Sequence, residues 1–90
     1  MAKLSKKLRP TIKNLSDIPN QSGAYLLYRG NNLPYVGSAD AGNLQTRIKQ
    51  QLNTKRGITT IRYKSTSSTQ EAKRWEKIYR DKYNPKQKYI

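Results

Sequence analysis

The segment GAYLLYRGNNLPYVG, residues 23–37, carries two short apolar runs on either side of the turn-forming tetrapeptide RGNN. Aliphatic and aromatic residues before and after such a turn are typical of a β-hairpin. Tyr25 lies in the first predicted strand and Tyr35 in the second. The two side chains share one face if the loop has an odd number of residues, for example 29–31, which places them directly opposite each other.

The segments after the hairpin predict a helix and then a third strand. Leu44, Ile48 and Leu52 recur every four residues and form one apolar stripe of a helix. Arg47 lies on a neighbouring face of that helix. The sequence ITTIRYK, residues 58–64, is β-branched and partly alternating, as strands are.

A final helix is predicted between Ser68 and Pro85. Ser68 and Glu71 have the spacing of a capping box, and a proline cannot continue a helix. The expected buried stripe of this helix consists of Ala72, Trp75, Tyr79 and Tyr83. The order β-β-α-β-α therefore predicts a small α+β domain with helices covering a sheet.

Charge is the strongest signal in the composition. The 90 residues include 19 Lys and Arg against five Asp and Glu, a net charge of +14 that is spread from Lys3 to Lys88. Such a chain attracts polyanions, and nucleic acid is the expected partner. A membrane surface is the weaker alternative, because no segment combines a broad apolar face with a basic one.

Domain boundaries follow from the same charge pattern. Residues 1–14 are expected to form a basic arm that either contacts phosphate or is only a solvated tail, and residues 15–90 a single domain. The candidate nucleic-acid contacts are Lys3, Lys6, Lys7, Arg9, Lys49, Lys55 and Arg56. With no membrane span, no signal peptide and no cysteine, we expect an intracellular protein, cytoplasmic or nucleoid-associated.

The residue types restrict the chemistry that is possible. Without histidine or cysteine, imidazole-based nucleases, histidine triads and thiolate zinc sites are excluded. Five carboxylates make a dense two-metal cage improbable. Phosphodiester hydrolysis remains possible with one hard cation held by a glutamate, an arginine that neutralises the phosphate, and tyrosines that orient or deprotonate the water.

Four pieces of the chain, taken in order, resemble the GIY-YIG endonuclease domain. They are GAY at 23–25, YVG at 35–37, Arg47 within a Leu/Ile helix, and Glu76 within EAKRWEKIYRDKYNP at 71–85. The likeness extends from about Ile18 to Lys88. It implies a three-stranded antiparallel sheet flanked by helices, and cleavage of DNA that depends on a divalent metal.

By this resemblance, Tyr25 and Tyr35 line the catalytic site and assist the attack of water. Arg47 contacts the scissile phosphate, which a planar guanidinium can bind through two oxygens. Glu76 binds Mg²⁺ or Mn²⁺, and Mg²⁺ accepts one carboxylate with phosphate oxygens and water as its other ligands. Gly23 and Gly37 are expected to support the site by letting the backbone lie close to the phosphate.

A non-catalytic nucleic-acid-binding module on the same scaffold is the alternative function. Gln51 stands where the family usually has His or Tyr, and Lys88 stands where Asn is typical, so both are candidate supporting residues whose effect on catalysis is open. Glu76 also has an ordinary explanation as the i,i+4 partner of Arg80. The sequence leaves open DNA against RNA, single against double strands, target specificity and the oligomeric state.

Overall fold

The computed structural model describes residues 3–87. Its elements, in order, are α1 (Ile12–Ser16), β1 (Ser22–Tyr28), β2 (Tyr35–Ala39), α2 (Leu44–Thr54), β3 (Thr60–Thr66) and α3 (Thr69–Tyr83). The predicted order of two strands, helix, strand and helix is confirmed, and the short helix α1 precedes it unpredicted. None of the helices in the described range is both long and apolar enough to cross a membrane.

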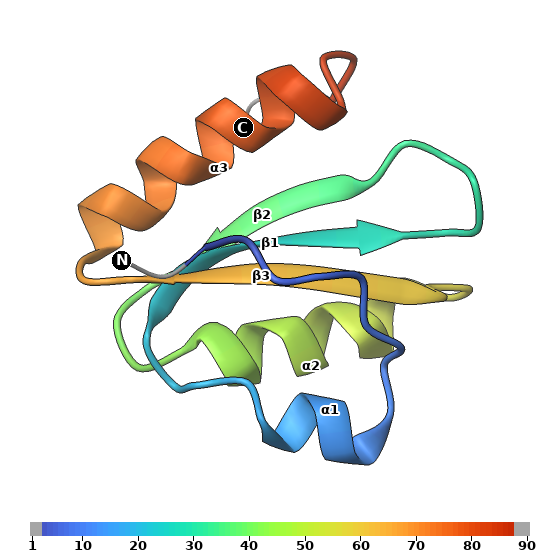
Figure 1. The fold of residues 1–90 in the computed structure, drawn as a ribbon, viewed down its shortest axis with the longest axis horizontal. Coiled ribbons are helices and arrows are strands. Elements are labelled where there is room, and N and C mark those ends of the chain that lie inside the picture. Colours follow the sequence, from blue (N-terminus) through green and yellow to red (C-terminus); the bar gives the residue numbers. More distant parts are fainter. Residues whose placement is uncertain (1–2, 88–90) are drawn as a thin grey trace.

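The three strands form one antiparallel sheet in the order β2-β1-β3. Figure 1 shows α3 over one face of this sheet, with α2 and α1 on the other side. All seven residues of the central strand β1 are buried. A strand covered on both faces needs no alternation of polar and apolar residues, which explains the continuous apolar run in this part of the sequence.

The hairpin register places Tyr25 opposite Gly37. Tyr35 is two residues before Gly37 on β2, so both tyrosines point to the same face of the sheet, as predicted. They are diagonal neighbours, so the direct pairing expected from a loop of residues 29–31 is wrong. The reason is a longer connection, residues 29–34, which ends in a proline without an N–H group for strand pairing.

Each face of the sheet has its own apolar core. On the α2 side, the largest buried side chains are Tyr25, Leu27, Leu44, Ile48 and Ile61. On the α3 side, the core consists of Ala24, Leu26, Tyr28, Val36 and Tyr79, against which Trp75 and Tyr83 pack. The predicted stripes of both long helices therefore face the sheet, which fixes how α2 and α3 are rotated about their axes.

The N-terminal segment lies along the outer border of β3. The backbone N–H of Ser5 donates to Tyr63 O at 2.8 Å, and Leu8 and Ile61 exchange two backbone hydrogen bonds at 2.9 and 2.7 Å. Helix α1 also begins inside the segment expected to form a basic arm, at Ile12. The described part of residues 1–14 is thus hydrogen-bonded to the sheet.

Candidate functional site

Tyr25 occupies the centre of the candidate site, with its ring in the core and only 1% of the residue exposed. A Cβ atom on Gly37 would lie 2.5 Å from both Cζ and Oη of this tyrosine. The phenol therefore lies directly over Gly37, in space that any side chain would fill. Because β2 is an outer strand of the sheet, this position brings the hydroxyl of a core residue to the sheet border.

Gly23 is a close-packing position of a different kind. A Cβ there would lie 2.5 Å from the carbonyl oxygen of Lys64 and 2.8 Å from a methyl carbon of Leu44. Neither Gly23 nor Gly37 has a positive φ angle. Their lack of a side chain thus serves the packing of β3, α2 and Tyr25, a role that the sequence pattern did not indicate.

The hydroxyl of Tyr25 is within electrostatic range of the three other predicted site residues. Burial raises its pKa from 10.0 to about 12, and a hydrogen bond donated by the Arg47 guanidinium, together with its charge, opposes this rise. The charges of Tyr35 and Glu76 raise the same pKa further. Arg47, Tyr35 and Glu76 therefore each influence the ionisation of this one phenol.

The raised pKa of Tyr25 has a measurable effect on stability. Between pH 10 and pH 12 the unfolded chain loses this proton while the folded chain keeps it. The free energy of unfolding should therefore fall with rising pH over this range, by about 2–3 kcal/mol from Tyr25 alone. Urea unfolding of the wild type and of Tyr25→Phe at several pH values measures the difference, and parallel pH profiles for the two proteins would contradict it.

Glu76 reaches the site from α3, on the opposite face of the sheet. Ser38 Oγ donates to its Oε1 at 3.0 Å, and Arg80 Nη2 donates to its Oε2 at 2.8 Å. The Glu76 side chain is 23% exposed and that of Arg80 only 8%. The Glu76–Arg80 ion pair expected from the i,i+4 spacing is therefore present, and it is largely buried. Tyr25 and Glu76 approach β2 from its two faces, and the site lies around the border of this strand.

The carboxylate of Glu76 can accept a metal ion besides these two hydrogen bonds. Each carboxylate oxygen has two lone pairs, so one donor per oxygen leaves acceptor capacity. Within residues 3–87 no three His, Cys, Asp or Glu side chains gather into a metal site. The residues present thus fit a cation such as Mg²⁺ or Mn²⁺ that takes one protein carboxylate and completes its shell with phosphate and water. The positive charge of Arg80 opposes the binding of such a cation.

Two hollows lie on the surface near Tyr25. The first, about 310 Å³, contains Tyr35, whose ring centroid lies 3.9 Å from Lys55 Nζ. The second, about 430 Å³, is lined by Ser38, Arg47 and Lys73 among others. Lys73 was not predicted as a site residue, because a lysine in a chain with so many exposed cations carries no distinguishing signal.

The border of β2 is held by the chain that follows α3. The Gln87 side-chain amide accepts from Val36 N at 2.8 Å and donates to Val36 O at 2.8 Å, as a paired strand would. Asn84 Nδ2 donates to Pro34 O at 2.7 Å. Sequence reasoning missed these residues and also Ser38. Lys88, the predicted supporting residue, lies outside the described residues, and the adjacent Gln87 makes the contacts seen here.

The other predicted residues are dispersed. Gln51 is half-buried one turn after Arg47 on α2. Lys7 Nζ lies 5.0 Å from the ring centroid of Tyr28, on the α3 face. The remaining predicted nucleic-acid contacts are exposed cations on the N-terminal segment and around α2: Lys3, Lys6, Arg9, Lys49 and Arg56. Of the predicted nucleic-acid contacts, Lys55 is the one placed beside a predicted catalytic residue.

The fold is a small α+β domain with a three-stranded antiparallel sheet, and the candidate residues Tyr25, Tyr35 and Glu76 lie at the β2 border of this sheet. Comparison with protein-family models, with curated proteins and with solved structures gives no match.

Proposed function

We propose that this protein is a divalent-metal-dependent endonuclease of the GIY-YIG type that hydrolyses phosphodiester bonds in DNA. The observation that carries this proposal is the position of three of the predicted residues along one stretch of β2. The Tyr25 phenol lies over Gly37, Tyr35 is two residues before Gly37 on the same face, and Glu76 accepts from Ser38, the residue after Gly37. Arg47, on α2, acts electrostatically on the Tyr25 phenol. The sheet of three antiparallel strands is also the one that the resemblance implies.

Arg47 is suited to bind the scissile phosphate. It is exposed on α2 and lines the hollow that also contains Lys73, and its charge lowers the pKa of the Tyr25 phenol. A guanidinium at this position can stabilise negative charge that develops on a phosphate in the transition state. The net charge of +14 attracts the DNA backbone to this surface.

Tyr25 acts as a hydrogen-bond donor in this proposal. Since its pKa is about 12, the phenol is protonated at neutral pH and can orient the attacking water or a phosphate oxygen through its O–H group. In this state Tyr25 has a positioning role. A dication held by Glu76, with the Ser38 hydroxyl beside it, would neutralise charge on the phosphate when bound.

A non-catalytic nucleic-acid-binding module remains the second candidate function. The observation that favours it is the environment of Glu76, whose two oxygens already accept hydrogen bonds from Ser38 and Arg80. A carboxylate whose charge is already neutralised by an ion pair with Arg80 has a structural role without a metal. In this alternative the domain binds phosphate through its cations, and binding weakens strongly with salt.

Incubation of supercoiled plasmid with the protein distinguishes the two functions. We expect nicked or linear product with Mg²⁺ or Mn²⁺ and none with a chelator. Arg47→Ala should lower the rate by about 100-fold to 1,000-fold, because it removes a charged donor from the transition state. Lys82→Ala is the control, since it removes one exposed cation from α3 that is not among the predicted site residues. Plasmid that stays intact with every dication, despite salt-sensitive binding, would favour the binding module.

A further inference from the structure

The first hollow, which we name the Tyr35 pocket, has the chemistry of a nucleotide site. Its apolar surface comes from the Tyr35 ring and from Leu27, Leu33 and Ile58. Its cations are Arg29, Lys55 and Lys86, and none of the carboxylates in residues 3–87 lines it. A ligand that matches this lining has a flat apolar body and negative charge.

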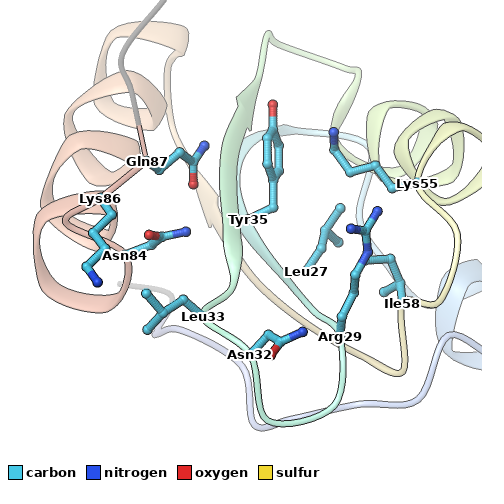
Figure 2. A pocket seen from close by; sticks show the side chains of 10 residues that line it. All are labelled: Leu27, Arg29, Asn32, Leu33, Tyr35, Lys55, Ile58, Asn84, Lys86 and Gln87. Atoms are coloured by element: carbon cyan, nitrogen blue, oxygen red, sulfur yellow. The ribbon is translucent and has the colours of Figure 1, made fainter.

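The dimensions and position of the Tyr35 pocket suit one nucleotide of a longer strand. Its volume of about 310 Å³ is at the lower end for small-ligand sites. Figure 2 shows loop residues Arg29, Asn32 and Leu33 at one end and Tyr35 with Lys55 at the other. Because Tyr35 is two residues before Gly37 on β2, and the Tyr25 phenol lies over Gly37, this end of the pocket adjoins the candidate cleavage centre.

The contacts of Tyr35 and Leu33 indicate how a base would bind. Lys55 Nζ lies over the Tyr35 ring at 3.9 Å from its centroid, in a position where an aromatic base can replace it. The displaced ammonium would stay close enough to pair with the phosphate of the same nucleotide. Leu33 is 53% exposed in the hairpin loop, so it offers apolar surface that a bound base would cover.

We propose that the Tyr35 pocket binds the unstacked base of a nucleotide next to the scissile phosphate, and that the preferred substrate is therefore nucleic acid with an unpaired nucleotide at this point. This inference rests on the proposed endonuclease function for the location of the phosphate. A continuous duplex keeps its bases stacked and presents none to the pocket without the cost of flipping one out.

Binding of a DNA duplex with one bulged nucleotide tests this inference without cleavage. The bulged base is 2-aminopurine, whose fluorescence reports stacking, and the same duplex without the bulge is the comparison, both in the absence of divalent metal. We expect about tenfold tighter binding of the bulged duplex and a change in its fluorescence. Leu33→Ser should remove most of this preference, because the apolar cover of the base is lost.

Ile12→Ser is the matched control, since Ile12 is an apolar residue 86% exposed on α1, away from the pocket. It should keep the preference for the bulged duplex. Equal affinity for bulged and paired DNA, or a preference that persists in Leu33→Ser, would overturn the pocket assignment. Because no metal is present, these results do not depend on cleavage, and a lack of cutting in a separate assay would count only against the nuclease proposal.

Discussion

Replacing Glu76 with glutamine is expected to reduce DNA cleavage by about 100-fold or more while leaving DNA affinity unchanged or slightly higher. The amide keeps an oxygen that can accept from Ser38 or Arg80 but loses the negative charge that holds a dication. Metal-dependent charge stabilisation contributes several kcal/mol to such reactions, and each 1.36 kcal/mol corresponds to about a tenfold change in rate. Cleavage rates over a Mn²⁺ series, with affinity measured in parallel, give both quantities.

Glu71→Gln provides the control for this prediction. It makes the same change in net charge on the same helix, but Glu71 lies in the first turn, where its carboxylate accepts from Ser67 Oγ at 3.2 Å. We expect cleavage by this variant at the wild-type rate. If Glu76→Gln cuts as fast as Glu71→Gln, Glu76 is not the metal ligand, and its ion pair with Arg80 is its whole role.

Substitution of Gly37 by alanine is expected to lower the free energy of unfolding by about 3 kcal/mol. The new Cβ would lie 2.5 Å from two atoms of the Tyr25 phenol, and that ring is enclosed by the core around Leu44 and Ile48. Such a ring cannot move away without disturbing its neighbours, and overpacking of this kind typically costs about 1–3 kcal/mol. For a domain of this size the melting temperature should fall by roughly 10–20 °C.

Two further variants separate this contact from a general effect of alanine. Gly30→Ala changes a loop glycine with a φ of +57° and no atom within 4 Å of its Cβ, so only the cost of backbone strain, about 1 kcal/mol, is expected. In a Tyr25→Leu background, Gly37→Ala should cost much less, because the clashing ring is absent. Equal losses for Gly37→Ala in both backgrounds would show that the ring is not the cause.

The element order and the buried faces could be predicted because they depend on local spacing. Leu44, Ile48 and Leu52 repeat at helical spacing, and the tyrosines sit on either side of a turn. Strand ends were less predictable. The second and third strands each begin two residues later than the sequence indicated, and β2 continues to Ala39, because pairing with β1 sets the ends of an outer strand.

The four candidate site residues follow from a motif that fixes their types and order, and their catalytic roles stay predictions. Their surroundings could not be predicted, since they depend on how distant segments meet. Ser38 and Gln87 are ordinary polar residues until the fold brings one to Glu76 and the other to Val36. The raised pKa of Tyr25 could not be predicted either, because it depends on how deeply the ring is buried in the fold.

The backbone groups of the two outer strands are hydrogen-bonded by different means, and this limits how far the N-terminal segment can be shortened. The side chains of Gln87 and Arg80 cover β2 at Val36, whereas β3 relies on backbone pairing with Ser5 and Leu8. Removing residues up to Leu8 would leave backbone amides and carbonyls of β3 without those partners. An unpaired edge strand can pair with another chain and so promotes aggregation. Shortened versions made for crystallisation should retain residues 3–8.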